Sequence, residues 1–150
     1  MSHLVLHVFI LSALYICAYS DFTVENRFSL VDKNRALDKL YFYNDESVDW
    51  GRAGGFCHLN GGQLWQPDSH DELVLVKSKL SSSISSVWLG LSPTWPERDF
   101  ESGRAYSYSN WESSRPTSGV AYMRVSDLKW VDANDNDKSR ALCESKSSSY

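Results

Sequence analysis

Three aspartates near the carboxyl end of the chain are the residues most suited to metal chemistry. The run from Asp132 to Asp137 resembles the start of an EF-hand calcium loop, which binds the ion through side-chain oxygens. That loop needs glycine at its sixth position and glutamate at its twelfth, where this chain has Asp137 and Cys143. The EF-hand interpretation therefore fails. A cation site built from Asp132, Asp135 and Asp137 stays open, as a weaker alternative to a solvated turn.

Histidine and cysteine side chains could serve as general bases and nucleophiles. Beyond the first 20 residues the chain has only His58 and His70, with Cys57 and Cys143. No serine–histidine–aspartate or cysteine–histidine arrangement with a supporting motif accompanies them. The sequence therefore indicates a binding protein and not an enzyme.

The first 20 residues have the pattern of a secretory signal peptide. Residues 4–16 are almost entirely apolar and too few to span a bilayer. Ala18 and Ser20 place small side chains at positions −3 and −1 of a cleavage site after Ser20. We therefore expect a secreted, extracellular protein whose mature chain begins near residue 21. A buried N-terminal helix is the alternative.

Cleavage after Ser20 would remove Cys17 and leave Cys57 and Cys143 as the two remaining cysteines. Secretion brings the chain into an oxidising environment, where two cysteines allow one intramolecular disulfide. A bridge between residues so far apart contributes roughly 4–5 kcal/mol on the chain-entropy model. Two free thiols remain the alternative.

The composition excludes several classes of protein. A chain of 150 residues with 42% apolar and 23% charged residues is typical of one globular domain. The formal net charge is −4 and no basic run occurs, so no nucleic-acid partner is expected. After the N-terminus no apolar run approaches the length of a membrane span, so none is expected there.

Helices and strands are predicted on either side of one long irregular segment. Apolar residues at helical spacing predict a helix from Trp50 to Cys57, and Ser69 with Glu72 has the spacing of a capping box that starts a second helix. Three of the four prolines lie in the irregular segment 92–119, and loops this long in compact domains are usually functional. Strands are expected at 40–43, 87–91, 120–125, 128–131 and around 141–143.

Several short segments occur in an order that gives the chain a resemblance over residues 40–144. Trp50 to Cys57 reads Trp-x-x-Ala-x-x-x-Cys, and Trp88 to Leu91 reads Trp-Leu-Gly-Leu. These resemble the first helix and the central strand of the C-type lectin-like domain family. Ser109–Trp111 resembles the end of that family's long loop. Trp130–Asp132 resembles its Trp-Asn-Asp segment, and Ala141–Glu144 resembles its closing strand.

The resemblance implies an α+β fold with two helices, small antiparallel sheets and a long loop that carries the ligand site. It also implies a disulfide between Cys57 in the first helix and Cys143 in the last strand. The organisation expected on this basis is a signal peptide at 1–20, an N-terminal segment at 21–39, the C-type lectin-like domain at 40–144 and a polar tail at 145–150.

The calcium site that the family uses for sugars is only partly matched. The family builds it from Glu-Pro-Asn in the long loop, a further acid and Trp-Asn-Asp. Here Arg115-Pro116-Thr117 stands for the first motif and Val131 replaces the asparagine of the last, which leaves Asp132 as the matching ligand. One carboxylate beside an arginine is a poor calcium site, so neither calcium nor another cofactor is expected. Gln66-Pro67-Asp68 spells the family's galactose-type motif, but it precedes Trp88 and is interpreted as a turn and helix cap.

The predicted function is carbohydrate recognition, without the usual calcium site, by the face that carries segment 92–119, which we call the long-loop face. Aromatic rings and polar side chains are the groups that bind sugars, and this segment has both. The expected partner is a carbohydrate or glycoprotein. The alternative is a calcium-independent protein-binding or structural module on the same fold. The candidate ligand-binding residues are Trp95, Tyr106, Tyr108, Asn110, Arg115, Thr117 and Asp132.

Overall fold

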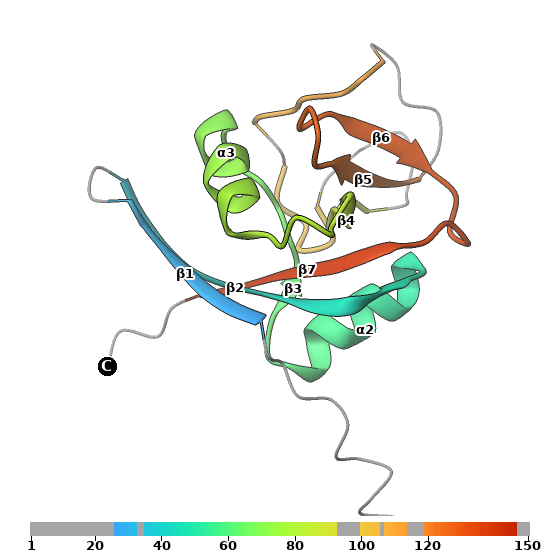
Figure 1. Cartoon of the computed structure of the whole chain (residues 1–150), viewed down its shortest axis with the longest axis horizontal. Helices are drawn as coiled ribbons and strands as arrows, with labels where there is room; N and C mark the ends of the chain where they lie inside the picture. Colours follow the sequence, from blue (N-terminus) through green and yellow to red (C-terminus); the bar gives the residue numbers. More distant parts are fainter. Residues whose placement is uncertain (1–25, 33–34, 93–99, 106, 114–118, 147–150) are drawn as a thin grey trace, which may run out of the picture.

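The structure is a computed structural model that describes residues 26–32, 35–92, 100–105, 107–113 and 119–146. Within these residues the chain forms two helices and a seven-stranded sheet (Figure 1). In chain order the elements are β1 (Asn26–Asp32), β2 (Arg35–Val48), α2 (Trp50–Leu59), β3 (Gln63–Leu64), α3 (His70–Lys79), β4 (Ser86–Trp88), β5 (Val120–Arg124), β6 (Trp130–Ala133) and β7 (Ser139–Lys146).

Both helices begin at a polar side chain that caps the backbone. In α2 the Asp49 carboxylate accepts a hydrogen bond from the N–H of Arg52 at 2.9 Å, and in α3 the Ser69 hydroxyl accepts one from the N–H of Glu72 at 3.2 Å. Such caps satisfy N–H groups that have no partner inside the helix. Both predicted helices are therefore confirmed. In the described part of the chain, neither helix is long and apolar enough to cross a membrane.

The strands follow one another in the sheet in the order β1-β2-β7-β4-β5-β6, and β3 also pairs with β7. The pairings are antiparallel except for a parallel bridge between Val87 of β4 and Arg140 of β7. The α+β class is confirmed, and this bridge joins the small antiparallel sheets that were expected into one mixed sheet. Figure 1 shows α2 on one side of β2 and β7 and α3 on the other.

The chain is regular before residue 40, where the sequence pattern predicts no strand. β1 pairs with β2 from Asn26 opposite Tyr43 to Asp32 opposite Arg35, and β2 pairs in turn with β7. At the other end β7 runs to Lys146, into the expected polar tail. The sheet therefore crosses both expected ends of the domain, because backbone pairing does not need the apolar alternation by which strands are found in a sequence.

A disulfide fixes the first helix to the last strand. Cys57 of α2 and Cys143 of β7 are bonded through their sulfur atoms, and their Cα atoms lie 5.4 Å apart. Both residues are fully buried. The expected bridge is therefore present, and it closes a loop across 86 positions of the chain.

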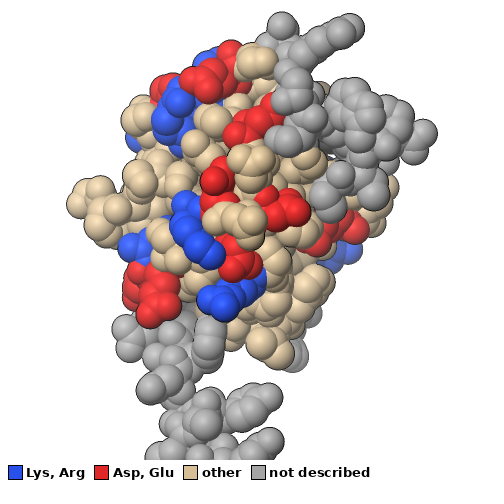
Figure 2. Space-filling model, turned by 90° about the vertical axis from the view of Figure 1, so that its right-hand side faces the viewer, with Lys and Arg blue, Asp and Glu red and all other residues tan. Residues whose placement is uncertain are grey.

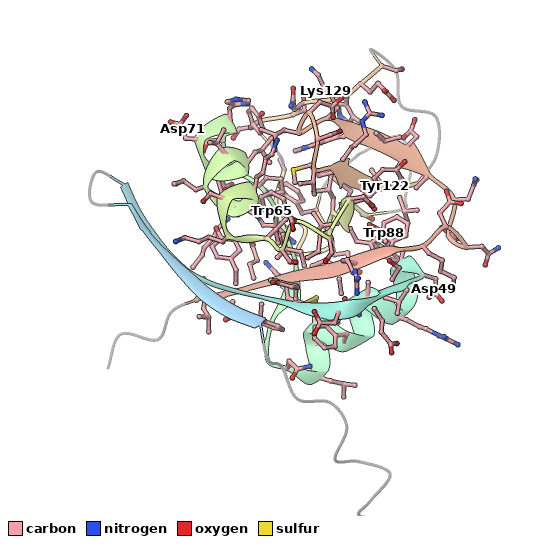
Figure 3. All side chains as sticks on the ribbon, viewed as in Figure 1. Asp49, Trp65, Asp71, Trp88, Tyr122 and Lys129 are labelled. Carbon is pink, nitrogen blue, oxygen red and sulfur yellow. A yellow bond between two sulfur atoms is a disulfide. The ribbon has the colours of Figure 1, made fainter. Side chains whose placement is uncertain are left out.

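The three largest fully buried side chains of the core are those of Trp65, Trp88 and Trp130. The indole N–H of Trp88 donates to the carbonyl of Val48 at 2.8 Å, and that of Trp65 donates to the carboxylate of Glu72 at 2.9 Å. A buried indole N–H needs such an acceptor. Figure 3 shows Trp65 between α3 and the sheet, so this tryptophan, which is additional to the family pattern, belongs to the core.

Candidate functional site

The long loop leaves the fold through a closely packed stem. The N–H of Gly90 donates to the carbonyl of Trp65, and the N–H of Glu101 donates to the carbonyl of Gly90, both at 2.8 Å. A Cβ atom at Gly90 would lie 2.5 Å from the carbonyl oxygen of Leu64. Glycine is therefore required at this close approach of two backbones, and the loop starts from a fixed point.

On its return the loop runs beside the start of β6. The N–H of Trp130 donates to the carbonyl of Asn110, and the N–H of Glu112 donates to the carbonyl of Trp130, both at 2.9 Å. The rings of Tyr108 and Trp111 meet the buried Trp130 ring edge-on, with centroid distances of 6.0 and 5.4 Å. This geometry is favourable for aromatic rings. Tyr108, Trp111 and Trp130, which we call the Trp130 cluster, therefore hold the loop against the core.

The side chain of Asn110 fastens the loop to the turn before β6. Its amide nitrogen donates to the carbonyl of Leu128 at 2.9 Å, and its amide oxygen accepts from the ammonium of Lys129 at 3.1 Å. Leu128 has a φ of 65°, in the left-handed region, which costs a non-glycine residue roughly 1–2 kcal/mol. Asn110 therefore has a structural role, and its contact with a ligand stays a prediction.

Two carboxylates beside the long loop are paired with the same cation. A guanidinium nitrogen of Arg124 lies 2.7 Å from the carboxylate of Glu112 and 2.6 Å from that of Asp127. The hydrogen bond from Arg124 lowers the pKa of Asp127 to about 2. The same carboxylates raise the pKa of Arg124. Both carboxylates are therefore engaged by the same guanidinium.

Of the three aspartates considered as a cation site, one lies on β6 and two lie in the connection between β6 and β7. Asp132 lies on β6 opposite Ala121, and the exposed Asp137 accepts a hydrogen bond from the N–H of Asn134 at 2.9 Å. Within the described ranges, no three histidine, cysteine, aspartate or glutamate side chains are grouped so that they could hold a metal ion. Asp132, Asp135 and Asp137 are therefore not brought together as ligands, and the solvated turn is the better interpretation.

The remaining predicted ligand contacts divide between described and undescribed residues. Tyr108 is half-buried, and its hydroxyl lies 3.3 Å from Nδ1 of His70. Burial raises the pKa of Tyr108, so its hydroxyl keeps the proton at neutral pH. Trp95, Tyr106, Arg115 and Thr117 lie outside the described residues, so their assignment stays a prediction.

A hollow of about 740 Å³ opens on another part of the surface. It lies between the C-terminal end of α2, the segment 63–68, the turn 102–104 and the end of β7. One of its lining residues is Lys39, whose ammonium nitrogen lies 2.8 Å from Asp68, 3.0 Å from Glu72 and 3.0 Å from Glu144. We call these four residues the Lys39 cluster.

Glu72 is the fully buried member of the Lys39 cluster. One carboxylate oxygen accepts from the hydroxyl of Tyr41 at 2.6 Å and from the indole of Trp65 at 2.9 Å, and the other accepts from the N–H of Asp68 at 2.7 Å. A buried charge is tolerated only where a partner and hydrogen bonds compensate for lost hydration. Glu72 has a paired cation and several hydrogen bonds, so the Lys39 cluster is a structural part of the fold.

The pKa values of the cluster depend on one another. Burial opposes the charge of Lys39, but attraction to Glu144 and Glu72 outweighs it and raises the pKa of Lys39. Burial raises the pKa of Glu144 against the opposing effect of Lys39. For Asp68, burial is outweighed by the hydrogen bond from Lys39, and the pKa is lowered. Lys39 is therefore charged at neutral pH.

The sequence interpretation misses this hollow because its residues come from segments with other assignments. Lys39 falls in the segment 21–39, which is predicted to lie outside the domain, and Gln66 to Asp68 is interpreted as a turn and cap. One feature of the sequence does point to the Lys39 cluster. Glu72 lies four residues before the buried Val76 on the same helix face, and a carboxylate on a buried face implies a buried partner.

Known proteins and a family model match most of the described part of the chain. A family model described as Lectin C-type domain matches residues 46–145. The chain is 28% identical over 116 residues to a tetranectin-like protein of Carcharhinus perezii, across 71% of this chain and 70% of that protein. It is 30% identical over 91 residues to C-type lectin mosGCTL-7 of Aedes aegypti, across 55% of this chain and 61% of that protein.

The fold is also found among solved structures. The mouse scavenger receptor C-type lectin carbohydrate-recognition domain superposes with a TM-score of 0.70 at 19% identity, across 85% of this chain and 99% of that one. At this identity the likeness concerns the fold. It agrees with the two helices and the mixed sheet described above.

Proposed function

The chain belongs to the C-type lectin family, and on that premise we propose that it is a secreted protein that recognises carbohydrate without the family's usual calcium site. C-type lectin domains bind carbohydrates or proteins and are in general not enzymes. The surface that we assign to the ligand is the long-loop face around the Trp130 cluster.

The pairing of Arg124 with Glu112 and Asp127 is the observation that carries the calcium-independent part of the proposal. A calcium ion takes six to eight oxygen ligands, several of them carboxylates. Both of these carboxylates already serve a guanidinium, and Asp132 is the one residue that matches a ligand in the family's motifs. Among the residues that the structure describes, no group of histidine, cysteine, aspartate and glutamate side chains could hold a metal ion, so no step of recognition is assigned to calcium.

Aromatic side chains supply the contact that calcium would otherwise make. Tyr108 and Trp111 are half-buried, which leaves part of each ring accessible to the apolar face of a sugar. The Tyr108 hydroxyl keeps its proton at neutral pH and supplies a hydrogen-bond donor beside those rings. Stacking combined with hydrogen bonding therefore supports carbohydrate as the ligand.

Secretion is part of the same proposal. The apolar segment and small-residue cleavage pattern of residues 1–20 support it, although these residues lie outside those that the structure describes. The disulfide between Cys57 and Cys143 also supports it, because structural disulfides persist in oxidising compartments.

A protein-binding or structural role on the same fold is the second candidate. Figure 2 shows basic and acidic side chains interleaved on the face of the molecule that lies at the right-hand side in Figure 1. Such a mosaic offers charges of both signs to a protein surface. The residues described on this face form no extended basic area of the kind that nucleic acids require.

A glycan array tests the proposed function. The purified protein is applied once with calcium and once with EDTA, and a calcium-dependent lectin on the same array serves as the control for chelation. We expect glycan binding that survives EDTA. Binding abolished by EDTA would show that the calcium site is intact, and no glycan signal with either buffer would favour the protein-binding candidate.

A further inference from the structure

We propose that the hollow beside the Lys39 cluster is a second binding site, which takes an uncharged sugar residue without a metal ion. It is distinct from the Trp130 cluster, to which the proposed function assigns the ligand. The hollow is lined by the end of β7, whereas β6, which begins at Trp130, is separated from β7 in the sheet by β4 and β5 (Figure 1). The two proposals share the class of ligand and are tested separately.

The walls of the hollow are held together by polar contacts. Arg104 forms an ion pair with Asp68, and a second guanidinium nitrogen donates to the carbonyl of Gln66 at 3.2 Å. The guanidinium also lies 4.6 Å from the centroid of the Phe100 ring. The hydroxyl of Ser102 donates to the side-chain oxygen of Gln66 at 2.8 Å. The turn 102–104 is therefore fixed against segment 63–68, and the hollow is formed before any ligand arrives, as is usual for small-molecule sites.

The side chain of Gln66 lines the hollow and is 1% exposed. Its oxygen is bonded to Ser102, but its amide nitrogen has no hydrogen-bond partner among the residues that the structure describes. Most buried polar groups in proteins are paired, and an unpaired one costs free energy. A ligand hydroxyl in the hollow would supply the missing acceptor.

The charges around the hollow favour a neutral ligand over an ion. Lys39 is bonded to all three carboxylates of its cluster, and Arg104 is bonded to one of them, so neither cation is left for an anionic ligand. The lysine and arginine residues that line the hollow are Lys39, Arg104 and Lys146, and its acidic lining residues are Asp68 and Glu144, so charges of both signs surround the space.

A sugar residue has the chemistry that this lining would recognise. Each sugar hydroxyl both donates and accepts hydrogen bonds, and the residues that line the hollow include the amide of Gln66 and the carboxylates of Asp68 and Glu144. Its volume of about 740 Å³ lies within the range of small-molecule sites. Gly61 in its wall carries no side chain, and a Cβ atom there would meet nothing within 4 Å.

The test is an NMR titration of the purified, ¹⁵N-labelled protein in EDTA with methyl α-mannoside, methyl β-galactoside or N-acetylglucosamine. We expect at least one sugar to shift the side-chain amide signals of Gln66 and the backbone signals of Gly61 and Gly62 until they saturate. The substitution Gln66→Leu keeps the size of the side chain and removes its amide donor. The Kd of this variant for the sugar is therefore expected to rise about three- to tenfold. Ser102→Trp places an indole in the opening and is expected to abolish these shifts.

Asn136→Leu is the matched control, because it removes an exposed amide from the turn before β7 and is expected to leave the Kd unchanged. Three sugars without a saturable shift at Gln66 would overturn the proposal. An unchanged Kd in both hollow variants, each with a cooperative thermal transition, would do the same. Shifts confined to the Trp130 cluster would overturn the second site and leave the proposed function standing. Shifts confined to the hollow would support the second site and contradict the assignment of the ligand to the Trp130 cluster.

Discussion

The ammonium nitrogen of Lys39 on β2 lies 3.0 Å from the carboxylate of Glu72 on α3, and that carboxylate is fully buried. The contact joins the sheet to the second helix across 33 positions of the chain. Because a buried carboxylate that loses its paired cation destabilises a fold, the packing of α3 against β2 depends on this lysine.

Lys39→Met is therefore expected to lower the free energy of unfolding by about 2–4 kcal/mol, since it leaves buried carboxylates without their cation. Urea unfolding followed by tryptophan fluorescence measures the change. Lys79→Met removes an exposed lysine at the end of α3 and is the control, with an expected change within about 0.5 kcal/mol. Equal losses in the two variants would contradict the role given to Lys39.

Asp127 is expected to titrate with a pKa of about 2, below the ordinary value of 3.8, because Arg124 donates hydrogen bonds to its carboxylate. The folded protein then binds this proton less readily than the unfolded chain does. The pair therefore contributes stability above pH 3.8 and loses it as the pH falls toward 2. Carbon-13 NMR of the carboxyl groups measures the pKa directly.

Arg124→Gln is the companion variant for that titration. It removes the guanidinium, so the pKa of Asp127 is expected to return toward 3.8. A pKa of Asp127 that is the same with and without Arg124 would refute the pairing.

Removal of both bridge cysteines by Cys57→Ser with Cys143→Ser is expected to cost roughly 4–5 kcal/mol of stability, because the open chain gains conformational entropy when it unfolds. Calorimetry of the melting transition measures the loss. Cys17→Ser is the control and is expected to change nothing in the mature protein, since it falls in the predicted signal peptide. Peptide mapping without reduction that finds Cys57 unpaired would show that the bridge does not form.

Gly90→Ala and Gly55→Ala are expected to change stability in opposite directions. A Cβ atom at Gly90 would lie 2.5 Å from the carbonyl oxygen of Leu64, so the stem of the long loop must shift and the protein is destabilised. At Gly55 in α2 nothing lies within 4 Å, and alanine there favours the helix by up to about 1 kcal/mol. Melting temperatures of the two variants compare them, and a loss at Gly55 would contradict the packing described.

The parts of the fold that could be predicted are those with a local chemical signature. The helix that ends near Cys57 follows from apolar spacing, and the start of the second helix follows from the hydroxyl of Ser69 three residues before Glu72. Both are confirmed because each pattern acts within one or two turns of the chain. One disulfide is allowed by the two cysteines that would remain after cleavage of the predicted signal peptide, and the structure contains it.

The parts that could not be predicted depend on residues far apart in the sequence. The hairpin of β1 and β2 is held by backbone pairing, which side-chain alternation does not reveal. Glu72 has the spacing of a capping residue, but its carboxylate is bonded to Lys39, Tyr41 and Trp65 instead. Only the fold brings those partners together, and so the hollow beside Lys39 has no counterpart in any sequence motif.

The covalent ring closed between Cys57 and Cys143 contains the entire long loop. A protease that cuts once within residues 92–119 therefore leaves two fragments that remain tethered, one molecule on a non-reducing gel and two after reduction. Both arms of the loop are also bonded to the core, at Gly90 and at Trp130. A molecule cut once in this loop is thus expected to keep its architecture.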